Sequence, residues 1–158
     1  MNELFKSIIE SWQIHNRSML FLIENLSDDA LACSLSKRGG RNVAAQLSHC
    51  LDVRFFRMEA YLKKHNIPLV PFGKEHIPTK AELLSAYEKT GEVMEQIILQ
   101  SLENGGKAPS FARGIVPMIG YYISHEAHHR GHALLTIKSS GITLPDSLKW
   151  GVWEWNKL

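Results

Sequence analysis

The chain has 158 residues, of which 44% are apolar and 22% are charged. This length suits one packed domain and is too short for two of ordinary size, so residues 1–158 are expected to form a single domain. The formal net charge is only +2 with eight histidines counted as neutral, which argues against nucleic acid as the main partner, because that partner usually needs a clustered basic face.

The first two long helices are predicted from apolar residues spaced by threes and fours. One covers residues 2–24 and has His15 on its apolar stripe. The connection that follows contains the pair Gly39-Gly40, and one helical turn is expected around Ala30. The other helix covers residues 42–64, with Asn42 as its N-cap.

Proline, glycine and capping residues delimit the next two helices. Residues 65–78 contain three prolines and cannot continue a helix. Thr79 and Glu82 then match a capping box, in which each side chain bonds a free backbone amide of the other, and they predict a third helix over residues 79–102. A fourth helix is predicted over residues 117–140, because Pro117 suits a first turn and Gly141 suits the position after the last one.

The predicted fold class is all-α. Four amphipathic helices of roughly 23 residues each are suited to side-by-side packing, and no segment alternates with period two for long enough to indicate a sheet. We therefore expect an antiparallel-type four-helix bundle with long connecting loops. The order of connection stays open, because each loop is long enough to cross the end of the bundle. The Trp-rich C-terminal tail, residues 142–158, is expected to pack back as an irregular cap.

The sequence also favours a soluble, reducing, cytoplasmic setting. Charged or strongly polar residues interrupt every apolar stretch, so no run approaches the roughly 18 residues of a membrane span and no membrane partner is expected. The chain opens without a signal-like stretch, and two cysteines cannot make a multi-bridge framework. Of these, Cys50 is expected to be a small buried core residue.

A cluster of histidines marks the fourth predicted helix. His125 and His129 lie one turn apart, on a face that continues to His132. Such a pair can bind one borderline metal ion such as zinc. A third ligand must come from elsewhere, and His49 is the leading candidate because it lies beside the apolar stripe of the second helix. The alternative is a pair of partly buried polar residues, or a solvated face, without metal.

The other histidines have more ordinary explanations. His128 points about 100° away from His129 and is assigned to another face, although a His125/His128 ligand pair is sterically possible. His65 and His76 lie in or beside the proline-containing segment and are expected to be exposed. His15 is either a core histidine with a hydrogen bond, which is favoured, or a pocket-lining group.

Two motifs stand out: residues 124–132 read Ser-His-Glu-Ala-His-His-Arg-Gly-His, and residues 46–49 read Gln-Leu-Ser-His. In these motifs, and over essentially its whole length, the chain resembles the DinB/YfiT-like metal-dependent family. The resemblance implies a four-helix bundle with a three-histidine metal site, carried here by His49, His125 and His129, and commonly a homodimer. One departure is His132, where the family often has glutamine. His132 is a candidate for lining the pocket or donating a proton, and the alternative is a buried histidine behind the ligands.

Two functions follow from such a site. Three protein ligands leave a coordination position open, where a metal lowers the pKa of bound water or stabilises a thiolate. The first function is enzymatic: hydrolysis of a small molecule, or transfer of a low-molecular-weight thiol to a small electrophile. The resemblance implies the thiol transfer, with bacillithiol or mycothiol as co-substrate in some members. Zinc is the favoured ion, although imidazole also accepts nickel, copper and iron. The alternative function is a non-enzymatic stress-response or ligand-binding bundle with a structural metal.

Two further charged positions lie close to the predicted ligands. Asp52, one turn from His49, can orient a ligand histidine or contact substrate, and an equally good interpretation is a solvated carboxylate. Glu126 and Arg130 are four residues apart and are expected to form a surface ion pair, so Glu126 is not assigned as a general base.

Overall fold

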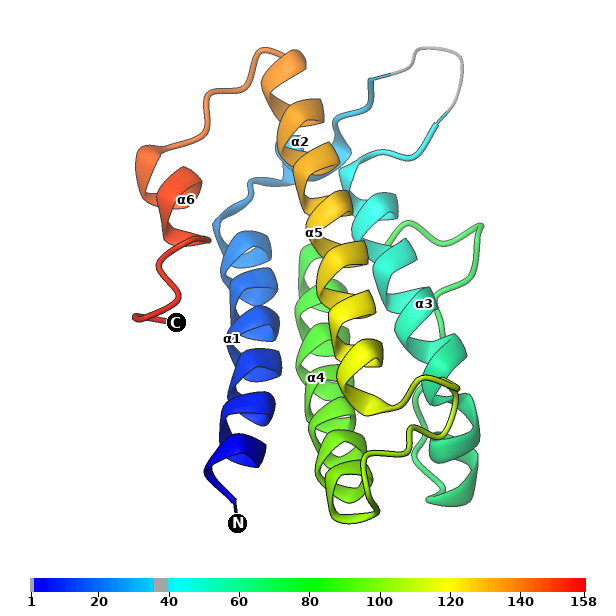
Figure 1. The fold of residues 1–158 in the computed structure, drawn as a ribbon. Coiled ribbons are helices and arrows are strands. Elements are labelled where there is room, and N and C mark those ends of the chain that lie inside the picture. The colour runs from blue at the N-terminus through cyan, green and yellow to red at the C-terminus, as the bar shows by residue number, and fades with distance from the viewer. Residues whose placement is uncertain (1, 36–39) are drawn as a thin grey trace.

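The computed structural model describes residues 2–35 and 40–158, so Gly39 of the predicted glycine pair lies outside the described residues. Within these ranges the chain forms a bundle of helices and contains no β-strand (Figure 1). The predicted all-α class is confirmed. The described residues form four long and two short helices: α1 (Glu3–Asn25), α2 (Asp28–Ala32), α3 (Val43–Lys64), α4 (Lys80–Glu103), α5 (Ile115–Ser139) and α6 (Asp146–Gly151).

Most helix ends are where local chemistry predicts them. The Asn42 side chain accepts a hydrogen bond from the Ala45 amide at 2.8 Å, and Thr79 and Glu82 form both bonds of the capping box. The start of α5 differs, because the helix begins two residues before Pro117. Gly114 precedes it with φ of 93°, and a Cβ there would lie 2.8 Å from the Gly106 carbonyl oxygen, so this entry into the helix requires glycine.

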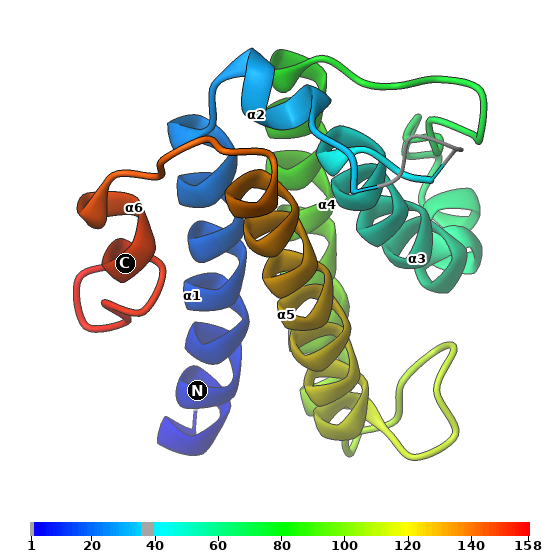
Figure 2. The ribbon, with the colours of Figure 1, turned by 90° about the horizontal axis from the view of Figure 1, so that it is seen from above.

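The four long helices do not alternate in direction. In Figure 1, α1 and α5 run upward and α3 and α4 run downward. Going around the bundle, α1 packs against α4, α4 against α3, α3 against α5, and α5 against α1. Two neighbouring pairs, α1 with α5 and α3 with α4, are therefore parallel, which departs from the antiparallel arrangement expected. The segment after α3 must return along the bundle before α4 begins, and α2 lies across the end where α1 finishes (Figure 2).

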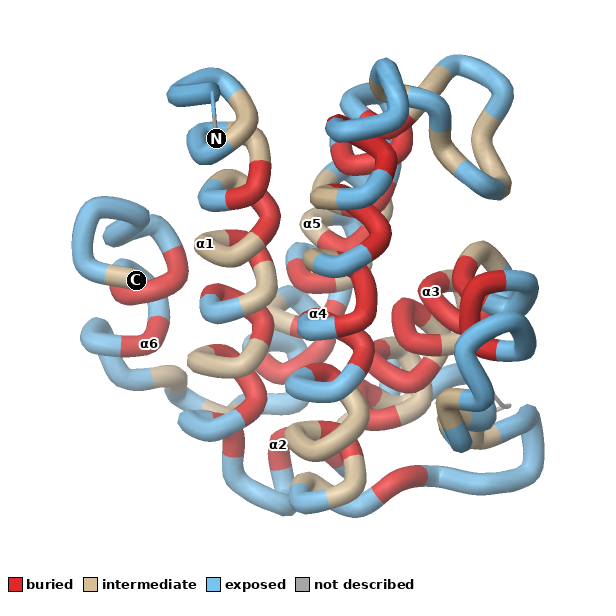
Figure 3. Tube along the Cα trace, turned by 90° about the horizontal axis from the view of Figure 1, so that it is seen from below, coloured by how far each residue is buried: buried red, intermediate tan, exposed pale blue. Residues whose placement is uncertain are grey.

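The core lies between the long helices, where buried positions recur along each of them (Figure 3). It contains large apolar side chains from all four. Trp12 is buried and donates its indole N–H to the Gly91 carbonyl of α4 at 3.1 Å. A Cβ on Gly91 would clash with Asn16, so α1 and α4 approach closely at this level. Within the described residues no helix is both long and apolar enough to span a membrane.

The C-terminal tail is more regular than an irregular cap. It contains α6, which packs on α1 through the buried Leu148 and places Gly151 against the Phe21 ring. Two of its tryptophans, Trp150 and Trp153, are 67% and 65% exposed. The tail therefore covers α1 with its small and aliphatic residues and leaves indole rings at the surface.

Candidate metal centre

Three histidine rings from two adjacent antiparallel helices meet at the edge of the core. His49 comes from α3, and His125 and His129 come from α5, one turn apart. One ring nitrogen of each lies within 4.8 Å of the others. The ring centroids are 5.4 Å apart for His49 and His125, 4.9 Å for His49 and His129, and 4.7 Å for His125 and His129. The structure thus brings together the three histidines that the sequence singled out.

The environment of these rings favours the neutral imidazole, which is the form that binds metal. All three are half-buried, and burial is the main cause that lowers the pKa of each. The pKa of His129 falls to about 4, because burial disfavours its charge and the neighbouring His125 and His49 repel it. At neutral pH each ring therefore offers a nitrogen lone pair.

The donor set fits a divalent ion. The Nδ1 atoms of His125 and His129 are buried and have no hydrogen-bond partner among the described residues. A buried polar atom without a partner costs free energy, and a ring nitrogen recovers that cost when it ligates a metal or donates to a neighbouring acceptor. Three imidazoles suit zinc, nickel, copper or iron, so the residues present fit the predicted ion without selecting one.

The expected surface ion pair between Glu126 and Arg130 is wrong. Glu126 is fully buried, and its carboxylate accepts two hydrogen bonds of 2.7 Å from Arg54 on α3 and lies 2.9 Å from His15 Nε2 on α1. Burial alone would raise the pKa of Glu126, but the charge and hydrogen bonds of Arg54, with His15, hold it at about 2. The favoured interpretation of His15, a core histidine with a hydrogen bond, is confirmed.

The error has a geometric cause. The buried stripe of α5 passes through Met118, Tyr122, Glu126, Arg130 and Ala133, one position on from the stripe that the histidines suggested. Glu126 therefore faces the centre of the bundle, and the histidines flank it.

Arg130 is also buried, and its side chain contacts α1 and the C-terminal tail. It donates to the Ser18 hydroxyl at 2.8 Å, and its guanidinium lies 5.1 Å from the Trp153 ring centroid.

Arg54 is the functional residue that sequence reasoning missed. It also donates to Asn16 Oδ1 at 2.8 Å and to Thr90 Oγ1 at 3.0 Å, so this one side chain contacts α1, α4 and α5. Its position on the buried side of α3, between Leu51 and Met58, was the available indication.

The orientation of Glu126 has a chemical consequence. Residues 125–129 read His-Glu-Ala-His-His, which matches the H-E-x-x-H pattern in which the glutamate of zinc proteases acts as general base. Here the carboxylate is committed to Arg54 and His15 in the core, so it is not available to activate water at the histidines.

The remaining predicted positions fall around the centre. His132 is exposed and its ring lies 4.1 Å from that of His128 and 6.2 Å from that of His129, so the buried alternative for His132 is wrong and a proton-donating role stays a prediction. His65 and His76 are exposed, as expected. Cys50 is buried as predicted, and desolvation raises the pKa of its thiol.

No hydrogen bond joins Asp52 to a ligand histidine among the described residues, and its carboxylate is only partly exposed to solvent. It is half-buried, and its Oδ1 atom is buried without a hydrogen-bond partner among the described residues. Desolvation raises the pKa of Asp52, while His49 acts in the opposite direction.

A helical bundle whose edge carries three converging imidazoles defines a candidate metal-binding protein of the all-α class. A model of the DinB family matches residues 1–148, and the chain belongs to that family. Searches of curated proteins and of solved structures found no match.

Proposed function

We propose that this protein is a metal-dependent enzyme that transfers a low-molecular-weight thiol to a small electrophile, with His49, His125 and His129 as the metal ligands. The observation that carries the proposal is the convergence of three half-buried imidazoles within 4.8 Å at the edge of the core. Three protein ligands leave a coordination position open for substrate. A divalent ion, zinc in the first place, would supply Lewis-acid chemistry there by lowering the pKa of a thiol or water.

The thiol must come from a co-substrate. Cys50 is buried and the pKa of its thiol is raised. The Cys33 thiol, beside α2, donates a hydrogen bond to the Asp29 carbonyl oxygen at 3.3 Å. In the reaction the co-substrate thiol releases its proton to solvent. Its sulfur then forms a bond to the electrophilic carbon, and the leaving group departs with the electron pair. The protein's own part is to hold the two substrates at the half-buried edge of α3 and α5.

Hydrolysis is the second reaction that such a site supports, but it would need a general base other than Glu126, such as Asp52, which lies one turn from His49 on α3. Hydrolases of this kind commonly use a carboxylate next to the metal ligands as general base. Glu126 is buried in its ion pair with Arg54 and cannot reach the site.

A purely structural metal is also disfavoured. Structural metals hold together parts that lack another core, whereas α3 and α5 here share a continuous apolar core and the Arg54–Glu126 pair. The three histidines lie at the rim of that core, so their metal is not needed to join the helices. This position supports an exchangeable, functional ion.

The test is an assay of the chelated protein reloaded with Zn²⁺, Ni²⁺ or Fe²⁺. Bacillithiol, mycothiol or cysteine is supplied with an electrophilic bimane, and conjugate is measured by fluorescence. We expect turnover in the loaded protein, its loss in His129→Ala, and its retention in His128→Ala, the matched variant on the exposed side of α5. Turnover of esters or amides instead of conjugation would assign hydrolysis. Unfolding of the chelated protein, with no turnover of any substrate, would assign a structural metal.

A further inference from the structure

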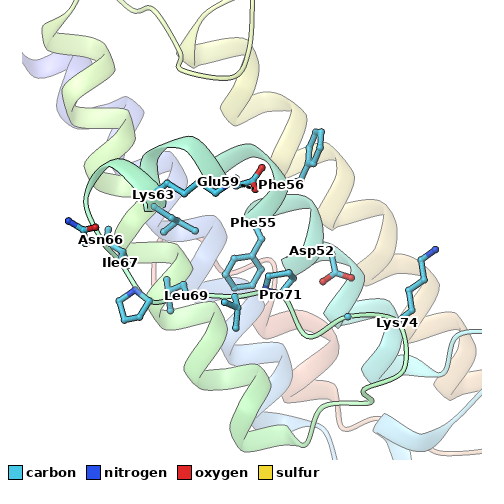
Figure 4. A pocket seen from close by; sticks show the side chains of 14 residues that line it. Asp52, Phe55, Phe56, Glu59, Lys63, Asn66, Ile67, Leu69, Pro71 and Lys74 are labelled. Carbon is cyan, nitrogen blue, oxygen red and sulfur yellow. Dashed lines mark hydrogen bonds and ion pairs between the residues drawn. The ribbon is translucent and has the colours of Figure 1, made fainter.

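A cavity of about 870 Å³ lies between α3 and the segment that follows it (Figure 4). This volume falls within the range of small-molecule sites, about 300–1,000 Å³. Its wall is mainly apolar: α3 contributes Phe55 and Leu62, and the segment contributes Ile67, Leu69, Val70 and Pro71. Because the chain's own segment already forms one wall, the space that remains fits a small molecule better than a further protein strand or helix.

One polar atom inside this lining lacks a partner. Asp52 lines the cavity, and Figure 4 shows its carboxylate pointing from α3 toward the segment that carries Pro71 and Lys74. Its Oδ1 atom is buried without a hydrogen bond among the described residues. Leaving such an acceptor unpaired costs free energy. An O–H or N–H group of a bound molecule would supply the missing donor.

Asp52 also connects the cavity to the metal centre. It lies three residues after His49 on α3, and side chains at this spacing are neighbours, with Cβ atoms about 5–6 Å apart. A molecule that reaches Asp52 therefore ends one helical turn from a metal ligand.

We propose that this cavity binds the electrophilic substrate, a small molecule with an apolar aromatic or branched body and one hydrogen-bond donor that Asp52 accepts. The apolar body lies against Phe55, Leu62 and Leu69, and the reacting end extends past Asp52 toward His49. The role of the ligand as a substrate rests on the proposed function, whereas its binding does not.

The binding test uses N-phenyl-1-naphthylamine, a neutral aromatic amine whose fluorescence rises in apolar surroundings. We expect saturable binding at one site per chain, weakened at least about tenfold in Leu69→Gln, because that change places an amide in the apolar wall. Val116→Gln, at a 52% exposed apolar residue on α5, is the matched control and should bind as wild type does. Equal binding by both variants, with unchanged helical circular dichroism, would overturn the proposal.

The role of Asp52 is tested by competition with 1-phenoxynaphthalene, in which an ether oxygen replaces the N–H. Wild type should prefer the amine by about three- to tenfold, the usual value of one hydrogen bond. Asp52→Leu should abolish the preference, and Asp52→Asn, which keeps an acceptor oxygen, should retain it. An unchanged preference in Asp52→Leu would remove Asp52 from the proposal.

His49→Ala separates this inference from the proposed function. The variant should lose metal but bind the probe as wild type does. If metal-loaded wild type binds the probe and transfers no thiol, the proposed function fails and the cavity remains a binding site. If thiol is transferred and the probe does not bind, the cavity fails as the substrate site.

Discussion

Arg54 and Glu126 face each other in the centre of the bundle, joined by two hydrogen bonds of 2.7 Å between guanidinium and carboxylate. Both side chains are fully buried. Glu126 directly follows His125 on α5, and Arg54 lies five residues after His49 on α3. The pair therefore fixes how α3 and α5 sit against each other, and with it the approach of His49 to the two histidines of α5. We regard Arg54 and Glu126 as positioning residues of the candidate metal centre.

Removing one partner of this pair should be severely destabilising. We expect Arg54→Met to lower the free energy of unfolding by about 3–5 kcal/mol, because Glu126 is left buried without its countercharge. Urea unfolding followed by circular dichroism measures the loss. The double variant Arg54→Met/Glu126→Leu should recover much of it, since no unpaired charge then remains. A double variant as unstable as the single one would contradict the assignment.

The same pair predicts how stability depends on acid. The pKa of Glu126 is held at about 2 in the folded protein, below its ordinary value of 4.5. A carboxylate with a depressed pKa contributes stability that is complete above the unfolded value and is lost as pH falls toward the folded one. We expect the stability difference between wild type and Glu126→Gln to shrink from about pH 5 to pH 2. Urea unfolding at several pH values measures it, and a constant difference would refute the prediction.

Metal content should depend on three particular histidines. We expect wild type to bind one divalent ion per chain, and His49→Ala, His125→Ala and His129→Ala each to lose it. His128→Ala, one residue from a ligand but exposed, should retain it. Because burial lowers the pKa of all three ligands, retention should persist below pH 6, where ordinary histidines become protonated. Elemental analysis after dialysis checks this, and full retention in all three ligand variants would exclude the site.

His132 is predicted to donate a proton, which in the proposed transfer goes to the departing leaving group. It lies on the exposed side of the centre, with its ring against that of His128. Proton transfer by a positioned side chain contributes about 10²- to 10⁴-fold, so His132→Ala should keep its metal and lose at least about 10²-fold in rate. His128→Ala is the control, because its ring is the one that contacts His132. Equal, small effects of the two substitutions on the rate would show that His132 is only a neighbour.

The exposed indoles of the tail predict self-association. Trp150 and Trp153 leave large apolar rings at the surface, and tryptophan is enriched at interfaces between proteins. We propose a homodimer in which Trp150 is buried. Sedimentation velocity at micromolar concentration should give a dimer for wild type and a monomer for Trp150→Glu, with Val116→Glu unchanged. A monomeric wild type would contradict this proposal.

The helices could be predicted because their causes are local. Apolar spacing of three and four, the Asn42 cap and the Thr79–Glu82 capping box act within a few residues of the ends that they define. The order around the bundle depends instead on contacts between distant segments. Nothing near residues 65–79 indicates that this segment returns along the bundle and makes α3 and α4 parallel.

In the candidate site, too, the features with local causes could be predicted and those that depend on distant contacts could not. The grouping of His125 with His129 follows from helical spacing, and His49 followed from its place beside the core. The burial of Glu126 could not be predicted from helical spacing, because a glutamate is buried in a core only where an opposite charge is placed beside it. The opposite charge, Arg54, lies on another helix, α3. In addition, assigning the buried face of α5 one residue too early along the helix is enough to place Glu126 at the surface instead of in the centre of the bundle.

The placement of the ligands on α3 and α5 has a consequence for the protein's biosynthesis. His49 leaves the ribosome with α3, but the whole of α4 is made before His125 and His129 follow. Until α5 has emerged and docked beside α3, the nascent chain offers isolated histidines and no centre. On the proposed function, metal binding is therefore one of the last events in the maturation of this protein, and it requires that α5 has already packed beside α3.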